Sequence, residues 1–477
     1  MAPQHPASPF FRRPPFLFRR THRDTARAPR VLLALACAAL VGCTGTFDSS
    51  QPGRAAIADS TLPPAKAFAA AHPQPPQRAN RDIARDFLDL HFNLEGGGTL
   101  PVFTRFDGPI TLRVTGAPPP GFEHELTRLL ARLRNEAGID ITRVNGDSAR
   151  ITIETVSRKA IRKALPKAAC FVVPNVTSLR DFRRKRRSPD TDWTRMRQRD
   201  NLALFLPSDV SPQELRDCLH EELAQALGPL NDLYRLSDSV FNDDNVHTVL
   251  TGFDMLILRA TYAPDLRTGM TRAEVAARLP GILARLNPRG QGIPPRPLPA
   301  TPRRWIAAIE TALGPDTRLS ERRLAARTAV EIGRASGWRD HRQAQGLYVL
   351  GRLIQADAPD SAQALFASAM EILRGQPGTE LHQARIRPRM AAYAIARGQP
   401  DAALTLLEPV PEIAARYENA ALLSTALMMQ AEALDLAGQF DAASAVRLDS
   451  LGWARYGFGP DWAVRAKLRE VANLRPH

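Results

Sequence analysis

Residues 211–232 read SPQELRDCLHEELAQALGPLND, the clearest helix signal in the first half of the chain. Ser211 suits a helix N-cap, Pro212 suits the first helical turn, and Glu214 stands three residues after the cap. Leucine and alanine then recur at helical spacing. The pattern predicts a helix that begins at Ser211-Pro212, runs to Leu227 and ends at the Gly-Pro pair that follows.

The segments before this helix alternate between strand and helix patterns. Leucines at helical spacing predict a helix over Phe122–Asn135. Alternating or continuous apolar runs predict strands at residues 110–115, 139–141, 149–156, 170–173 and 202–206. Strands mixed with helices in this order indicate an α/β or α+β domain.

Three features of this half resemble a bacterial lipoprotein family known only as domain of unknown function twenty-nine twenty-seven. They are the Glu-Glu-Leu-Ala-Gln-Ala-Leu-Gly helix with Asn231-Asp232 behind it, the Ser239-Val-Phe element, and the block from Asp254 to Met270. The resemblance covers roughly residues 80–290. That family is in turn similar to the gluzincin and metzincin metallopeptidases, which implies an α+β, zincin-like domain over residues 81–290.

The zincin motif His-Glu-x-x-His-x-x-Gly places two imidazoles on one helical face to hold zinc, and a glutamate beside them to polarise water. Aligned on Gly228, the motif puts Glu221 at the first ligand, Glu222 at the general base and Gln225 at the second ligand. Asn231 falls at the third histidine of metzincins. Only Glu222 is the expected residue type, and a glutamine amide is a poor zinc ligand. The resemblance therefore implies a degenerate site, for which we expect no metal and no cofactor.

Two other interpretations of this helix remain open. A register that starts at His220 also lacks the second ligand, although His220 could join Glu221 and His247 in an unorthodox metal site. Met255 stands where a metzincin has its methionine turn, but a methionine in an apolar run is usually part of the core. The alternative to a metal site is a hydrogen-bonded polar cluster that closes the helix end, made of Glu221, Glu222, Gln225 and Asp232.

The N-terminus has the pattern of an export signal. Residues 1–42 contain seven arginines and one aspartate, and they end in the uncharged stretch VLLALACAALVG, too short to span a bilayer as a helix. Leu40-Val-Gly-Cys43 resembles a bacterial lipobox. We therefore expect a lipoprotein signal peptide over residues 1–42, lipidation of Cys43 and a Pro/Ala-rich tether over residues 43–80. The alternative is an ordinary signal peptide followed by a chance cysteine.

Cysteine use and charge agree with export. Thr44 after the lipidated cysteine favours the outer membrane, with the protein facing the periplasm. Cys170 and Cys218 then remain as a possible disulfide in an oxidising compartment, or as two separate buried thiols. Residues 1–42 carry +6 of the formal net charge of +15, and residues 180–199 carry another +6. A patch this local predicts a solvated surface loop, or docking to anionic envelope material, rather than nucleic-acid binding.

The second half of the chain has no strand signal. It follows a Pro-rich linker, residues 291–302, and contains the repeat Gly398-Gln-Pro-Asp-Ala-Ala and Gly438-Gln-Phe-Asp-Ala-Ala, with a weaker copy at Asp357-Ala-Pro-Asp-Ser-Ala. The copies are spaced by 41 and 40 residues. This resembles tetratricopeptide repeats, and predicts an all-α helical-repeat domain over residues 303–477. A helical bundle with a chance duplication is the alternative.

These observations support two hypotheses. In the first, the protein is a non-catalytic envelope adaptor, held to the membrane by its N-terminal lipid, whose helical repeats bind an envelope protein. In the second, it is a divergent hydrolase of peptides or peptidoglycan that uses Glu222 as general base.

Overall fold

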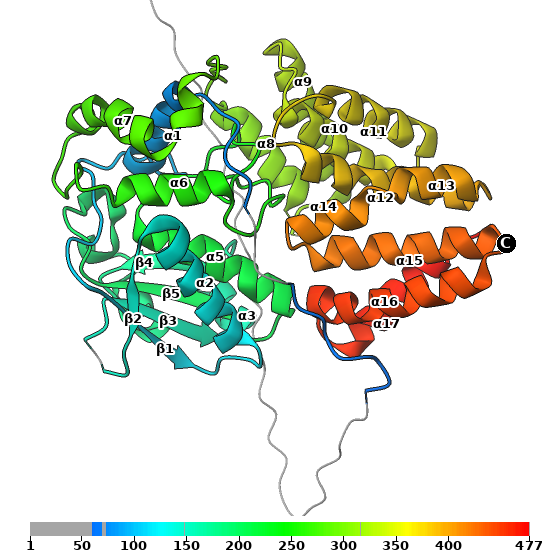
Figure 1. Ribbon diagram of the computed structural model, residues 1–477, viewed down its shortest axis with the longest axis horizontal. Helices are drawn as coiled ribbons and strands as arrows, with labels where there is room; N and C mark the ends of the chain where they lie inside the picture. Colours follow the sequence, from blue (N-terminus) through cyan, green and yellow to red (C-terminus); the bar gives the residue numbers. More distant parts are fainter. Residues whose placement is uncertain (1–59, 69–72, 147, 315, 477) are drawn as a thin grey trace, which may run out of the picture. The chain divides into compact units, whose positions relative to one another are not determined.

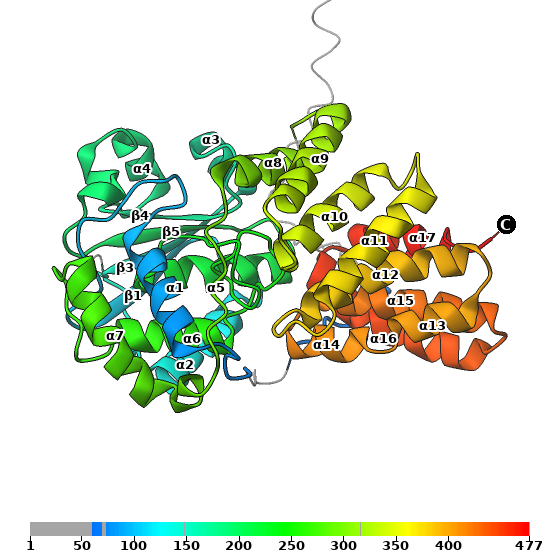
Figure 2. The same cartoon turned by 90° about the horizontal axis from the view of Figure 1, so that it is seen from above.

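The computed structural model describes residues 60–68, 73–146, 148–314 and 316–476. From Ser60 onward these residues fall in one compact unit. The predicted signal peptide, Cys43 and Thr44 lie outside the described residues. An N-terminal α/β region is followed by a helix-rich C-terminal region (Figures 1 and 2).

A five-stranded mixed sheet forms the centre of the α/β region. Its strands are β1 (Ile110–Gly116), β2 (Ile141–Arg143), β3 (Ile151–Val156), β4 (Phe171–Pro174) and β5 (Leu202–Pro207). Their order is β2-β1-β3-β5-β4, and only the edge strand β4 runs antiparallel to its neighbour. Every predicted strand is present, with its ends within two residues of the expected positions.

Strand β5 is buried on both faces, which explains its continuous apolar sequence LALFLP. Leu202, Leu204 and Leu206 join one core, which includes helices α1 (Asn80–Phe92), α2 (Phe122–Ala137), α5 (Pro212–Leu227), α6 (Gly252–Thr261) and α7 (Arg272–Leu286). Ala203 and Phe205 join a smaller core under α3 (Arg158–Ala164) and α4 (Leu179–Lys185). The sheet is therefore a central layer between two layers of helices.

Helix α5 has the bounds that the sequence predicts. Ser211 Oγ accepts a hydrogen bond from the Glu214 amide at 3.2 Å, and Gly228 follows the last helical residue, Leu227. One face of α5 packs on the sheet and on α2, so most of its side chains are buried. The cap and the Gly-Pro stop set the two ends of this helix.

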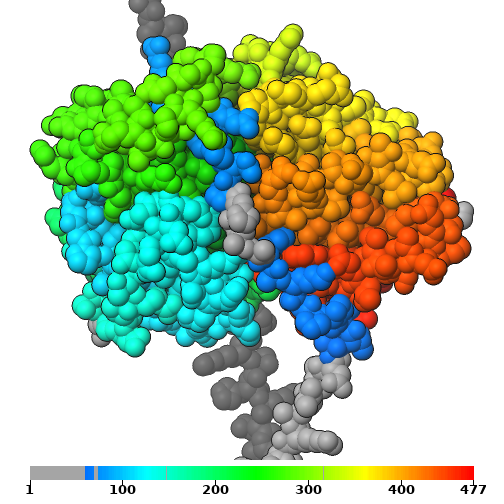
Figure 3. All heavy atoms as spheres, viewed as in Figure 1, coloured from blue at the N-terminus to red at the C-terminus, as the bar shows by residue number. Residues whose placement is uncertain are grey.

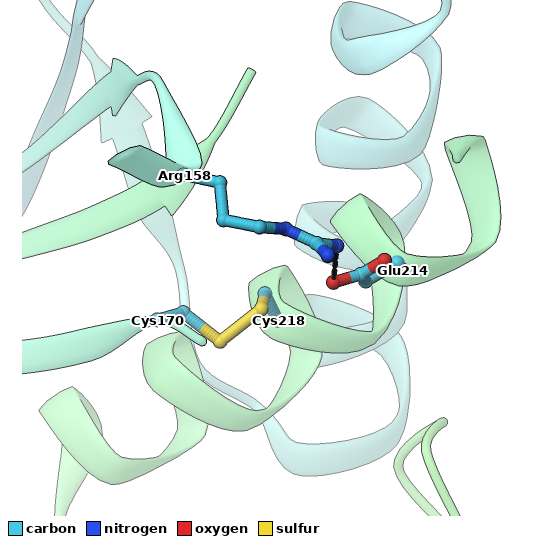
Figure 4. The surroundings of a disulfide bond; sticks show 4 residues. All are labelled: Arg158, Cys170, Glu214 and Cys218. Carbon is cyan, nitrogen blue, oxygen red and sulfur yellow. Dashed lines mark hydrogen bonds and ion pairs between the residues drawn. A yellow bond between two sulfur atoms is a disulfide. The ribbon is translucent and has the colours of Figure 1, made fainter. Parts of the chain in front are cut away.

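A disulfide fastens α5 to the edge of the sheet (Figure 4). Cys170, just before β4, is bonded to Cys218 on α5, at a sequence separation of 48. An ion pair between Arg158 and Glu214 lies beside it. A covalent link across a loop of this length restricts the unfolded chain, so it stabilises the packing of α5 against the sheet.

The basic run 180–199 is only partly a solvated loop. Most of its arginines are at least partly exposed, but Arg199 is fully buried. Its guanidinium donates to the carbonyls of Gln225, Ala226 and Gly228 at 2.9, 2.8 and 2.5 Å. These carbonyls have no partners within α5 and carry the negative end of the helix dipole, so a buried cation is stable there. The prediction of a wholly solvated run is wrong at this residue.

The C-terminal region is built of helices, and no strand occurs in its described residues. Its helices are α8 (Arg303–Leu313), α9 (Leu319–Ala335), α10 (His341–Ile354), α11 (Pro359–Leu373), α12 (Glu380–Ala396), α13 (Pro400–Leu407), α14 (Val410–Arg416), α15 (Ala420–Leu436), α16 (Phe440–Phe458) and α17 (Asp461–Ala472). Among the described residues, no helix is both long and apolar enough to cross a membrane.

The repeated hexapeptide marks equivalent turns between these helices. Gly398 and Gly438 both have positive φ, of 65° and 75°, and each stands just before a helix, α13 and α16 respectively. Ala362, Ala403 and Ala443, which occupy the same place in the three copies, are all fully buried. The repeat is therefore structural: glycine permits the left-handed turn and alanine permits close packing of the next helix.

The predicted tether over residues 43–80 is too long, because its second half lies on the folded body. Residues 60–68 and 73–79, here called the strap, make specific contacts (Figure 3). Ser60 Oγ donates to Asp461 at 2.6 Å, and the Phe68 ring stacks on Trp453 at 4.7 Å between centroids. Sequence composition could not reveal this, because Pro- and Ala-rich segments without periodicity fit both a tether and a docked strand.

The second part of the strap contacts the start of α6. A Cβ atom on Gly252 would lie 2.0 Å from the carbonyl oxygen of Gln74, so only glycine permits this approach. We expect Gly252→Ala to displace residues 73–79 and to accelerate proteolytic cleavage before α1 by about tenfold, equivalent to ~1.4 kcal/mol of local stability. Limited proteolysis followed by mass spectrometry measures this rate. Gly281→Ala, inside α7 with open space around it, is the matched control; equal cleavage of both variants would contradict the expected role of Gly252.

Candidate functional site

The degenerate zincin motif lies on α5 and in the turn after it. Glu222 and Asn231 are buried, whereas Glu221, Gln225 and Asp232 are partly exposed. Glu222 Oε2 and Asp232 Oδ1 have no hydrogen-bond partner among the described residues. These two oxygens are therefore not part of the hydrogen-bonded cluster that is one interpretation of the sequence.

Electrostatic repulsion links the three carboxyl groups. Burial, followed by the nearby Asp232, raises the pKa of Glu222 to about 8. Burial and Glu222 raise the pKa of Glu221 well above its usual value, and burial and Glu221 do the same to Asp232. Neighbouring carboxyl groups removed from water cannot all be ionised. The raised pKa therefore favours the protonated form of Glu222, which does not suit a general base.

The predicted metal ligands do not converge. Asn231 donates to the Asp89 carbonyl at 3.0 Å, and His220 Nδ1 accepts from the Leu250 amide at 3.2 Å. His247 lies against Tyr417 with 4.9 Å between ring centroids. Within the described part of the chain, no three or more His, Cys, Asp or Glu side chains are placed to hold a metal ion. The unorthodox combination of His220, Glu221 and His247 is thus not assembled.

Met255 and two aspartates in the loop after α5 have structural roles. Met255 lies inside α6 and is 2% exposed, so it belongs to the core and to no turn. Asp243 accepts a hydrogen bond from the Tyr234 hydroxyl at 2.8 Å, and burial raises its pKa to about 6. Asp244 pairs with His382 at 3.1 Å. These aspartates hold the loop after α5 in place.

A cavity of about 720 Å³ lies away from α5, between the α/β region and the helices, and we call it the central cavity. Its lining residues fall within 73–86, 235–238, 249–253, 293–299, 336–341, 376–380 and 416–418, together with Arg132. None of Glu221, Glu222, Gln225, Asn231 and Asp232 lines it. No pattern in the sequence predicts this cavity.

Three equivalent turns form the helical wall of the central cavity. Gly337, Gly378 and Glu418 all have positive φ, and they are spaced by 41 and 40 residues. This spacing matches that of the hexapeptide repeat. One end of each helix pair therefore carries the visible hexapeptide, and the opposite end faces the cavity. The regular spacing of these turns along the sequence is the signal from which this wall of the cavity could have been predicted.

The central cavity is lined by charged groups in pairs. Arg235 bridges Asp86 and Asp89, each at 2.7 Å, and Arg78 pairs with Asp238. Arg132 Nη1 is buried and has no partner among the described residues. Apolar side chains such as Phe253 and Trp338 complete the lining. A concave surface on which most charged groups are paired and a few polar groups lack partners is typical of a binding site.

Residues 80–281 match the family model described as "Protein of unknown function (DUF2927)". The chain carries a domain of this family. This is the family that the α5 motif and the block around Asp254 indicate, and the match spans the sheet, α5, α6 and most of α7. No curated protein matches the chain.

Buried polar contacts fix the helical region to the DUF2927 domain. Arg216 on α5 is fully buried and donates to the Glu418 carbonyl at 2.8 Å, and Arg128 on α2 donates to the Glu418 carboxylate at 2.5 Å. Tyr456 on α16 donates to Glu125 at 2.6 Å. Because hydrogen bonds to buried charges are costly to break, the two regions hold one arrangement around the central cavity.

A group of buried histidines reinforces this interface. His341 Nε2 donates to the Tyr234 carbonyl at 2.7 Å, and the His382 ring lies 5.6 and 6.0 Å from those of His341 and His247. Burial lowers the pKa of His247 and of His341 to about 4. These two rings are therefore neutral at neutral pH and act as packing groups.

The carboxyl groups on α5 make stability depend on pH. The folded-state pKa of Glu222 lies above its unfolded value of 4.5, so its stabilising contribution is complete below pH 4.5 and is lost as pH rises through about 8. We expect Glu222→Gln to gain at least about 1.4 kcal/mol of unfolding free energy relative to wild type between pH 5 and pH 8, equivalent to one pKa unit. Urea unfolding at several pH values measures the gain. Parallel pH curves for the two proteins would contradict the raised pKa.

Proposed function

We propose that this protein is an envelope lipoprotein that binds a partner or ligand in its central cavity and has no catalytic role. The observation that carries the proposal is the cavity itself, which has one wall from the DUF2927 domain and one from the helical turns. Buried groups at its edge, Arg132 Nη1 and Glu418 Oε2, lack hydrogen-bond partners among the described residues. Groups of this kind favour a ligand that can satisfy them.

The proposal treats the DUF2927 domain as a zincin-like scaffold that has lost its metal. A long helix packed on a mixed sheet, with Glu222 at the base position, supports that origin. Glutamate and glutamine at the two ligand positions, Glu221 and Gln225, support the loss, because zinc sites of this kind need neutral imidazoles. The helix pairs with a period of about forty residues support a tetratricopeptide-like domain for an envelope protein partner.

The proposed location rests on the N-terminal sequence. Its basic segment, short apolar stretch and lipobox support export, lipidation of Cys43 and attachment to the outer membrane on the periplasmic side. The disulfide between Cys170 and Cys218 is compatible with that oxidising compartment. Sixteen residues separate Cys43 from Ser60, so the folded body can stand at most about 60 Å from the lipid.

Site-specific photocrosslinking tests the binding role. Ser336 is exposed and lines the central cavity, whereas Ser320, on the same α9 segment, is exposed and lies outside it. With a photoreactive p-benzoylphenylalanine at each position in turn, we expect irradiation of living cells to add a defined mass at position 336 and none at position 320. Intact-protein mass spectrometry detects the adduct. No adduct at 336, or equal adducts at both positions, would contradict a ligand in the cavity.

The divergent hydrolase remains a second candidate because Glu222 and Asp232 keep unsatisfied, buried carboxyl oxygens side by side. Perturbed acids of this kind also occur in active sites. Our proposal expects the full chain to show no chelator-sensitive hydrolysis of peptides or peptidoglycan fragments, and Glu222→Gln to change nothing in that assay. A chelator-sensitive activity that Glu222→Gln abolishes and Glu221→Gln retains would establish the hydrolase instead.

A further inference from the structure

The strap brings the N-terminal part of the chain to one particular place on the surface. Ser60, the first described residue, donates to Asp461 at the start of α17, and Thr61 accepts a hydrogen bond from Arg465 at 2.5 Å. The chain before Ser60, which carries Cys43, therefore starts beside the first turn of α17. Sixteen residues separate Cys43 from Ser60 in the sequence.

An exposed tryptophan stands at the same place. Trp462 follows Asp461 directly and is 72% exposed, the highest value among the large apolar side chains exposed in the described residues. Leu448, next to the Asp449 that pairs with Lys66 of the strap, is 63% exposed. Single exposed apolar side chains are common on protein surfaces. These two are distinguished by their position beside the strap.

The exposed face of α17 combines this tryptophan with positive charge. Trp462, Arg465 and Arg469 are spaced by three and four residues, so they share one side of the helix, and all three are exposed. Arg469 makes no side-chain hydrogen bond or ion pair with any residue that the structure describes. Tryptophan prefers the boundary between lipid and water, and arginine is attracted to anionic headgroups. Tryptophan and arginine are also enriched at protein interfaces, so the choice of a lipid surface rests on the position of this face beside the strap that leads to the proposed anchor.

We propose that the face of α17 around Trp462 lies on an anionic lipid bilayer, with Trp462 in the interface and Arg465 and Arg469 at the headgroups. The inference rests on the proposed lipid anchor for its setting. An anchor with a short linker gives an effective concentration in the millimolar range, so a weak intrinsic affinity suffices to keep this face on the membrane. The contact orients the molecule with its strap and α17 toward the lipid.

The test separates the face from the anchor. The mature chain from residue 44 onward, which lacks both the predicted signal peptide and Cys43, is sedimented with vesicles of phosphatidylethanolamine and phosphatidylglycerol at three to one, up to 10 mM lipid. We expect binding with a dissociation constant in the millimolar range, weakened at least about tenfold by Trp462→Ala. Leu324→Ala is the matched control, because Leu324 is 66% exposed on α9 and lies outside the α17 face.

Charge is tested in the same assay. Arg469→Gln is expected to weaken binding to phosphatidylglycerol vesicles several-fold, and vesicles of phosphatidylcholine alone are expected to bind less than the anionic ones. Absence of binding at 10 mM lipid, or unchanged binding of Trp462→Ala, would overturn the proposal. Since Cys43 plays no part in this assay, its outcome is independent of whether the native chain is acylated, which mass spectrometry of the native protein decides separately.

Discussion

Helix α5 is fixed at both ends and by contacts on two sides. The positions of its acidic residues and of the central cavity both depend on where this helix lies. Ser211 caps its first turn, and the buried Arg199 donates to its last carbonyls. The disulfide from Cys218 to Cys170 joins it to the sheet, and Arg216 joins it to the helical region. Because α5 contacts both the sheet and the helical region, a shift of α5 would move Glu221, Glu222 and the walls of the central cavity together.

The chemistry of the α5 surface follows from replacing imidazoles by carboxyl and amide groups. Two histidines would be neutral in this buried setting and could share a cation. Glu221, Glu222 and Asp232 instead repel one another when ionised, and burial raises the pKa of each. Protonation removes the cost of burying a charge, but a buried carboxyl oxygen without a hydrogen-bond partner, such as Glu222 Oε2, still destabilises the fold.

The repeat turns and the strap mark two contact surfaces of the helical region. One set of turns, at Gly337, Gly378 and Glu418, faces the DUF2927 domain and the cavity. The C-terminal part of α16 and the start of α17 hold the first part of the strap through Trp453 and Asp461. The same part of α16 contacts the DUF2927 domain, where Tyr456 donates to Glu125 on α2. In our proposal a lipid surface lies along the exposed face of α17.

Much of the fold could be predicted because it depends on local patterns. The sequence alone determined the five strands, the bounds of α5, the all-helical second half and the family of residues 80–281, since period, caps and turn residues act within a few positions. Only the tertiary structure decided that Arg199 is buried, that residues 60–68 and 73–79 are docked, and that a cavity lies between the two regions. Those outcomes depend on which distant surfaces meet, and a charge or a proline in sequence carries no information about the partner that folding brings to it.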